Sequence, residues 1–187
     1  MIAQRTEIEA MGAKHDIKSM CASEVDILAD GSLDYNDDIL SKLDIVIASV
    51  HSDLNIGRDA MTKRLIRACE NPYVTIIGHP TGRYLNGFAG YDFDYDAVFA
   101  AAARTGTALE MDGQAMRLDL PAPLARRARE LGVTLTTDSD AHGIEDLPNL
   151  ELAVGQARRA GLTKGDILNT RSYEGVRAFV EAKRKKI

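Results

Sequence analysis

The sequence predicts an α/β fold built around a parallel sheet, and three observations predict it. Short apolar runs of strand character recur along the chain, and segments with helical periodicity separate them. Ionisable residues stand near the end of each run, about one β/α unit apart. Near-continuous apolar strands that alternate with helices are typical of a parallel sheet covered by helices. The 187 residues suit a single domain, 1–187, with a sizeable core.

Five segments rich in β-branched and apolar residues are expected to be strands. They are 18–23 (KSMCAS), 44–51 (DIVIASVH), 74–79 (VTIIGH), 107–112 (TALEMD) and 133–138 (VTLTTD). The last of these runs into two carboxylates and an imidazole within DSDAH, 138–142. Buried charges cost several kcal/mol unless they are neutralised, so water, a salt bridge or a metal ion must lie there.

Helical patterns separate the expected strands and follow the last one. They cover 1–14, 61–70, 96–106, 122–132, 149–161 and 172–186. Asp59 is expected to cap the second helix, and Gly106 and Gly132 to end the third and fourth. The first helix begins without a capping residue, so we expect that more sequence precedes it in the natural protein.

Two architectures fit this alternation, a doubly wound open sheet and a β/α barrel. The sequence has no GxGxxG and no GxxxxGK[ST], so nucleotide binding by an open sheet has no support. Ionisable residues instead recur in phase with the strands, at intervals of 27, 28, 31 and 30 residues: Glu24, His51, His79, Glu110 and Asp140. Such a series at the carboxyl ends of strands favours the barrel, whose active site lies there.

The polar residues near the strand ends have the chemistry of metal ligands. Three imidazoles and two carboxylates suit manganese, zinc or iron: Glu24, His51, His79, Asp140 and His142. Two such ions about 3.5–4 Å apart would hold a phosphoester and activate water. We expect Asp140 and His142 to point to the same side, as alternate residues of a strand do. The alternatives are a solvated acidic loop around Glu24 and structural histidines; His15, before the first strand, is assigned a structural role.

Three further features have two interpretations each. Arg83, in GHPTGR, could bind a substrate phosphate or form a salt bridge with Asp92, Asp94 or Asp96. Glu110 and Asp112 share one face of a strand and are expected to reach the site or to orient its ligands. The cationic end of the chain, 182–187, is expected to be a solvated tail rather than a DNA contact.

Composition excludes several classes of protein. The formal net charge of −5 argues against a general nucleic-acid coat, and no apolar run approaches the length that spans a membrane. Cys21 and Cys69 form no CxxC pair, which predicts two buried thiols in a reducing, cytoplasmic setting.

The motifs SEVDILADGSLDY, ASVHS, NPYVTIIGHPTGR, ALEMD, RLDL and DSDAH, in this order and spacing, resemble the PHP (polymerase and histidinol phosphatase) domain. The version attached to bacterial family X DNA polymerases is the most similar, and the resemblance covers essentially the whole chain. It implies a distorted, TIM-like β/α barrel of seven strands with three metal ions at the carboxyl ends of the strands. It also implies phosphoester hydrolysis, and for the polymerase-linked members a manganese-dependent 3′–5′ exonuclease or 3′-phosphatase that acts on DNA 3′ ends in repair.

The resemblance also assigns ligands and shows departures from the family. Glu24 would bridge the first two ions, His51 and His79 would complete the second, Asp140 would join the first, and His142 would belong to the third. The family's HxH motif and the ligands that follow it have no counterpart here, so about five of seven β/α units and fewer than three ions are expected. Asp112 stands where the family commonly has Asn.

Three functions remain open at this stage. The first is a DNA-directed phosphoesterase linked to a family X polymerase, the second a small-molecule phosphatase of the histidinol phosphatase type, and the third a non-catalytic metal-binding or structural remnant. A partial barrel has open strand edges, so we expect the chain to self-associate and cover them.

Overall fold

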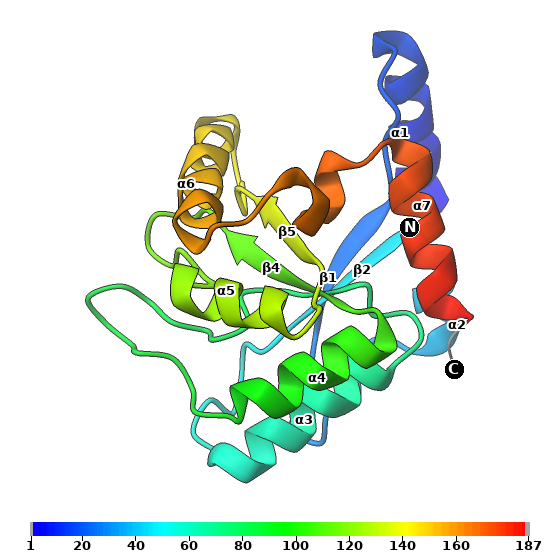
Figure 1. The fold of residues 1–187 in the computed structure, drawn as a ribbon. Coiled ribbons are helices and arrows are strands. Elements are labelled where there is room, and N and C mark those ends of the chain that lie inside the picture. Colours follow the sequence, from blue (N-terminus) through cyan, green and yellow to red (C-terminus); the bar gives the residue numbers. More distant parts are fainter. Residues whose placement is uncertain (1, 186–187) are drawn as a thin grey trace.

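The computed structural model describes residues 2–185, in which five parallel strands alternate with helices (Figure 1). The strands are β1 (Ala22–Asp26), β2 (Ile45–Ser49), β3 (Ile76–Ile77), β4 (Ala108–Asp112) and β5 (Leu135–Asp138). The α-helices are α1 (Ile2–His15), α2 (Asp37–Leu40), α3 (Arg58–Glu70), α4 (Tyr95–Thr105), α5 (Ala122–Glu130), α6 (Leu150–Ala160) and α7 (Tyr173–Arg184). Three 3₁₀ helices, Ile144–Asn149, Lys164–Asp166 and Leu168–Thr170, lie in the last third of the chain.

The strands follow one another in the sheet in the order β1-β2-β3-β4-β5, and every neighbouring pair is parallel. A doubly wound sheet reverses its strand order at a switch point, and this sheet does not. The sequential order is that of consecutive β/α units, as in a barrel. The predicted α/β class is therefore confirmed, with β1 and β5 at the two ends of the sheet in the described part of the chain.

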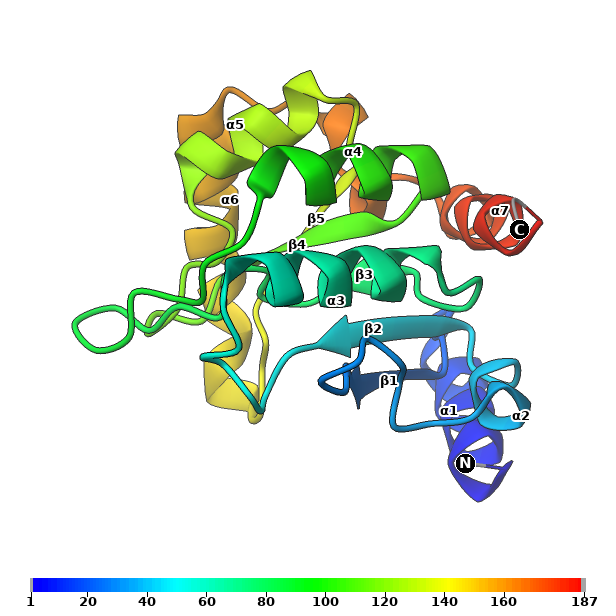
Figure 2. The ribbon, with the colours of Figure 1, turned by 90° about the horizontal axis from the view of Figure 1, so that it is seen from below.

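Helices α3, α4 and α5 cover one face of the sheet (Figure 2). Several strand residues that point to this face are fully buried: Val46, Leu109 and Leu135. The expected caps are mostly present. Gly106 ends α4 with a φ of 76°, a left-handed conformation that glycine adopts without strain. The N-cap of α3 is Gly57, however, so the prediction that Asp59 caps this helix is wrong; Asp59 lies in its first turn.

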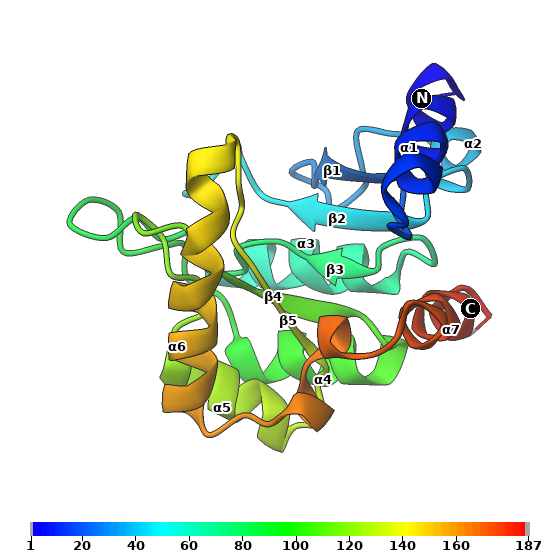
Figure 3. The ribbon, with the colours of Figure 1, turned by 90° about the horizontal axis from the view of Figure 1, so that it is seen from above.

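The other face of the sheet is apolar near the amino ends of the strands and polar near their carboxyl ends. Near the amino ends of the strands, Ile76 and Ala108 form an apolar cluster with Leu168, and Phe179 of α7 packs against it. Near the carboxyl ends the residues of the same face are ionisable. Helix α7 lies at the amino end of the strands and α6 at the carboxyl end (Figure 3). The fold thus closes one end of this face with apolar side chains and leaves the polar end accessible.

The cationic C-terminal segment is not the solvated tail that we expected. Lys183 is 1% exposed, and its Nζ donates to the backbone oxygen of Cys69. Arg184 donates to the backbone oxygen of Leu43 at 2.6 Å. These two cations join α7 to the rest of the molecule; Lys186 and Ile187 lie outside the described residues. Among the residues that are described, no helix has both the length and the hydropathy needed to cross a bilayer.

Candidate metal centre

The first strand begins four residues later and ends three residues later than predicted, and this moves Glu24 from a loop onto the sheet. We expected a strand over 18–23 followed by Glu24, whereas β1 runs from Ala22 to Asp26 with Glu24 at its centre. His51 follows β2 and His79 follows β3 by two residues each. Because parallel strands end at one edge of the sheet, these three side chains meet there.

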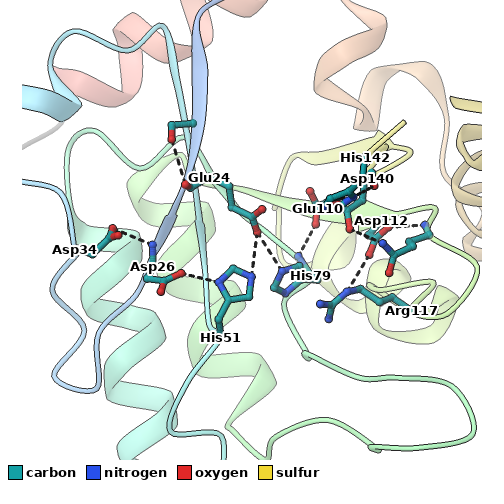
Figure 4. Close-up of polar contacts among 12 residues, drawn as sticks. Glu24, Asp26, Asp34, His51, His79, Glu110, Asp112, Arg117, Asp140 and His142 are labelled. Carbon is teal, nitrogen blue, oxygen red and sulfur yellow. Dashed lines mark hydrogen bonds and ion pairs between the residues drawn. The ribbon is translucent and has the colours of Figure 1, made fainter. Parts of the chain in front are cut away.

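Glu24, His51 and His79 point toward one another (Figure 4). One carboxylate oxygen of Glu24, Oε1, lies 3.2 Å from Nε2 of His79 and 3.5 Å from Nε2 of His51. One donor atom from each residue lies within 4.8 Å of the other two. His79 is buried, with a side-chain exposure of 4%, whereas Glu24 and His51 are about 40% exposed. The three donors thus lie partly buried at the edge of the sheet, with Glu24 and His51 open to solvent.

The chemistry of these donors fits a divalent ion. A ligand distance of about 2.1 Å in a tetrahedral site places neighbouring ligand atoms roughly 3.4 Å apart, close to the two separations seen here. The hydrogen bond from His79 lowers the pKa of Glu24 to about 2, so its carboxylate is charged at neutral pH. The second ring nitrogen of His79, Nδ1, is buried without a hydrogen-bond partner, so Nε2 is the nitrogen that faces Glu24.

Asp26 fixes the orientation of the His51 ring, a role that our sequence interpretation missed. Nδ1 of His51 lies 2.6 Å from Oδ1 of Asp26. A carboxylate only accepts, so Nδ1 carries the proton, and Nε2 of a neutral ring then presents its lone pair to the Glu24 carboxylate. Two lone pairs would thus face each other, an arrangement that a bound cation would stabilise. Asp34 in turn holds Asp26, because its Oδ1 accepts from the backbone N–H of Asp26 at 3.0 Å.

Glu110 holds His79 through a hydrogen bond to its backbone. Its Oε2 accepts from the backbone N–H of His79 at 2.5 Å, as expected for a residue that orients a ligand. His79 has a φ of 27°, a left-handed conformation that is strained for a residue with a side chain. Burial raises the pKa of Glu110, and the Asp138 charge nearby adds to this effect.

Asp140 and His142 do not join the three converging donors. Strand β5 ends at Asp138, and Asp140 has a φ of 46°, so the expectation that both side chains share a strand's alternation is wrong. The His142 side chain is 73% exposed, and its Nδ1 lies 2.8 Å from the backbone oxygen of Asp140. Asp140 does border the same cavity, of about 430 Å³, as Glu24 and His79.

A set of further carboxylates, Asp112 and Asp138, interacts with Asp140. Desolvation raises the pKa of Asp112 to about 7 and that of Asp138 to about 7. Gln114 joins this set to Asp140, because its Nε2 donates to Asp140 Oδ2 at 3.1 Å and its backbone N–H donates to Asp112 at 2.5 Å. Nε of Arg117 lies 3.8 Å from Asp112. These buried carboxyl groups hold their protons more tightly than usual, and a bound cation would favour their charged forms.

The guanidinium of Arg83 donates to backbone oxygens of a neighbouring loop. Its Nε donates to the backbone oxygen of Arg117 at 2.9 Å, and its Nη2 donates to that of Leu118. The salt-bridge interpretation is wrong, because Asp92 and Asp94 pair with Arg58 and Asp96 pairs with Arg127. His15 is an exposed residue at the end of α1, and Cys21 and Cys69 are buried free thiols as predicted.

A sequential parallel sheet that gathers imidazoles and carboxylates at its carboxyl edge defines a β/α protein of the barrel-related class, with its site at the strand ends. No family model matches the chain. It is 42% identical over 179 residues, 95% of its length, to the DNA polymerase/3′–5′ exonuclease PolX of Bacillus subtilis, of which it covers 31%.

Shorter relatives match along most of their length. The chain is 34% identical over 174 residues, 88% of its length, to a probable phosphatase of Thermoanaerobacter sp. strain X514, of which it covers 68%. A probable phosphatase of Caldanaerobacter subterraneus subsp. tengcongensis is 33% identical over 169 residues, 84% of this chain and 63% of the relative. The chain thus belongs to the PHP family, and this membership classes it with the phosphoric ester hydrolases. It spans about a third of the Bacillus subtilis protein and about two thirds of these phosphatases.

Proposed function

We propose that the protein is a metal-dependent phosphoesterase in which Glu24, His51 and His79 hold a divalent ion, manganese or zinc in the first place and iron as an alternative. The observation that carries the proposal is the convergence of these three donors within 4.8 Å at the carboxyl edge of the sheet. Two imidazoles and a carboxylate suit such ions. When bound, the ion supplies positive charge to a phosphoester and lowers the pKa of a bound water.

The other residues of the site have separate tasks in this proposal. Asp140 borders the cavity beside Glu24 and would complete the site once substrate is bound. His142, exposed at the rim, would bind a further ion only if its side chain rotated inward. We propose fewer than the three ions of the family, and a partial PHP-type barrel over 1–187 as the fold that holds them.

The proposed substrate is a DNA 3′ end, which a 3′–5′ exonuclease or 3′-phosphatase would process in repair. Support comes from the Bacillus subtilis relative, whose name includes a 3′–5′ exonuclease and which matches 95% of this chain. A small phosphate ester is the second candidate, because the relatives that this chain covers most fully are named probable phosphatases. A bond from Arg83 Nε to the backbone oxygen of Arg117 joins these two arginines, and in this proposal their positive charges favour either substrate.

The test compares three substrates in the presence of manganese: a single-stranded oligonucleotide, histidinol phosphate and p-nitrophenyl phosphate. We expect the oligonucleotide to lose nucleotides or a phosphate from its 3′ end. His51→Ala should reduce the rate by about 100-fold or more, since it removes a ligand. His15→Ala is the matched control, an exposed histidine outside the site, and should retain the wild-type rate.

Metal binding by the wild type and by His51→Ala distinguishes a catalytic metal site from a non-catalytic metal-binding module. If isothermal titration with manganese detects one site in the wild type and none in His51→Ala, the donors act as proposed. Binding without hydrolysis of any of the three esters would instead favour a non-catalytic metal-binding module. Equal binding by His51→Ala and the wild type would contradict the proposed ligands.

A further inference from the structure

Two loops beyond the carboxyl ends of β3 and β4 pair with each other. We call residues 83–88 and 114–118 the loop pair. Leu85 donates its backbone N–H to the backbone oxygen of Met116 at 2.7 Å, and the Arg83 guanidinium spans from one loop to the other. Within the first loop, Tyr84 donates its backbone N–H to the oxygen of Phe88 at 2.7 Å. The loop after β3 extends farther beyond the strand ends than the loops around it (Figures 1 and 3).

The loop pair exposes three large apolar side chains. Tyr84 is 38% exposed, Leu85 42% and Met116 62%. Leu85 and Met116 are neighbours because a backbone hydrogen bond joins them, and Tyr84 precedes Leu85. An exposed aromatic ring is a surface on which a flat ring system can stack.

Arg117 contacts the Tyr84 ring and its hydroxyl and so holds the ring in place. The guanidinium carbon of Arg117 lies 4.2 Å from the centre of the ring, and its Nη2 donates to the tyrosine hydroxyl at 2.5 Å. Arg117 itself is only 8% exposed. One face of the ring is therefore occupied by a cation, and a partner that stacks on the exposed part would find the ring already oriented, at little entropic cost.

The same arginine connects the ring to the cavity. Its Nε lies 3.8 Å from Asp112, whose carboxylate accepts from the backbone of Gln114. The Gln114 side chain donates to Asp140, which borders the cavity together with Glu24 and His79. Tyr84 is thus connected to Asp140, in the wall of the cavity, through three residues: Arg117, Asp112 and Gln114.

We infer that the loop pair is a base-binding subsite. A base near the end of a single-stranded nucleic acid stacks on Tyr84, against Leu85 and Met116, while the adjoining phosphoester enters the cavity. The two guanidinium groups of the loop pair favour the charge of the nucleic-acid backbone. The inference rests on the proposed function and narrows its substrate to one that carries a base, because an ester as small as histidinol phosphate would leave the ring uncovered.

The test uses 2-aminopurine, a base whose fluorescence falls when it stacks. Nuclease-resistant oligonucleotides carry it at one of the last positions before the 3′ end and are titrated with protein and manganese. We expect quenching by the wild type at one or two of these positions. Tyr84→Ala should abolish it, and Tyr84→Phe should retain it, since the ring remains and only the hydroxyl is lost. Tyr35→Ala is the matched control: Tyr35 is also 38% exposed and lies in the loop that precedes α2.

Hydrolysis gives a second readout that separates this inference from the proposed function. Tyr84→Ala should raise the KM for an oligonucleotide by about 10-fold and leave the hydrolysis of histidinol phosphate unchanged. If the wild type hydrolyses no ester and Tyr84 still governs quenching, the proposed function fails and the subsite stands. If Tyr84→Ala quenches like the wild type, or if no oligonucleotide binds, the subsite is overturned, and a protein partner becomes the better explanation of the three exposed apolar side chains.

Discussion

At the scale of single residues, the carboxylate of Asp26 decides how His51 presents its second nitrogen. The 2.6 Å contact leaves Nε2 directed at Glu24, and Asp34 holds the backbone of Asp26 in turn. Carboxylates that orient ligating histidines in this way tune metal affinity strongly. The acidic DGSLDY segment therefore contributes to the site through Asp34, although none of its side chains faces the ion directly in our proposal.

Asp26→Asn is expected to weaken manganese binding by about 10- to 100-fold. The amide can still face Nδ1, but it stabilises neither the proton there nor the donor strength of Nε2 as a carboxylate does. Asp92→Asn, at an aspartate whose side chain is 75% exposed and away from the three donors, should change nothing. Isothermal titration with manganese measures both. Equal affinity in Asp26→Asn and wild type would show that the contact does not orient the ring.

Asp112 should make the metal-free protein less stable as the pH rises. Its pKa is about 7 in the folded chain and near 3.8 when unfolded, so between these values the folded state holds a proton that the unfolded state has lost. Stability therefore falls from about pH 4 to pH 7, and the full cost is present above pH 7. Asp112→Asn should raise the free energy of unfolding by about 1–3 kcal/mol at pH 8 and by less at pH 5.

Urea unfolding in the presence of a chelator measures this difference. The amide can keep the bond from the Gln114 backbone to Oδ1, which isolates the effect of the charge. A gain of the same size at both pH values would show that packing, rather than ionisation, distinguishes the two side chains.

The candidate site was predictable from the sequence in its residue types and only partly in its geometry. The spacing of Glu24, His51 and His79 predicted one common edge, because each β/α unit advances by one strand. Asp26 was missed because the strand was expected to end at residue 23, which hid the alternation that places Glu24 and Asp26 on one face. The expectation that Asp140 and His142 alternate as in a strand was wrong, because the strand ends at Asp138 and Asp140 has a left-handed conformation.

At the scale of elements, helices were predicted more accurately than strand ends. Helices α4, α5 and α6 match their predictions closely because glycine or proline marks their ends. Strand β1 was displaced because SEVD is polar, and its ionisable side chain faces a cavity rather than a core. Burial of Lys183 could not be predicted either, since its carbonyl partner, Cys69, is 114 residues away in the sequence.

Gly78 controls the approach of β3 to β2 just before His79. A Cβ at this position would lie 2.3 Å from Ser49 Oγ and 3.0 Å from Ile47 Cγ2. Gly78→Ala should therefore destabilise the protein by about 1–3 kcal/mol and weaken manganese binding, because it displaces the segment that carries His79. Urea unfolding and metal titration measure the two effects.

Two companion variants make the Gly78 experiment specific. In α6, a Cβ on Gly155 meets nothing within 4 Å, so Gly155→Ala should be neutral or stabilise the protein by up to about 1 kcal/mol. Adding Ser49→Ala to Gly78→Ala removes the nearest contact and should restore part of the loss. If Gly78→Ala behaves like Gly155→Ala, the close approach does not position His79.

At the scale of the whole molecule, the two ends of the sheet differ in how their backbone groups are satisfied. The outer edge of β5 is covered by Asn169, whose side chain exchanges two hydrogen bonds with the backbone of Thr137. The carboxyl end of β1 is covered by Asp34, which bonds the N–H and the oxygen of Asp26. Within the described chain, the amino half of β1 has no strand on its outer side.

We expect the protein to self-associate through this part of β1, because an uncovered strand edge is a template for another strand. Cys21 and Ile27 bond toward β2, so by alternation the N–H of Ala22 points outward. Ala22→Pro removes this outward N–H, blocks an added strand and leaves the bonds to β2 in place. Sedimentation velocity should show the wild-type mass rising with concentration, whereas Ala22→Pro should keep the mass of one chain. Circular dichroism must show the same secondary structure in both, and a wild type that remains a single chain at every concentration would contradict the prediction.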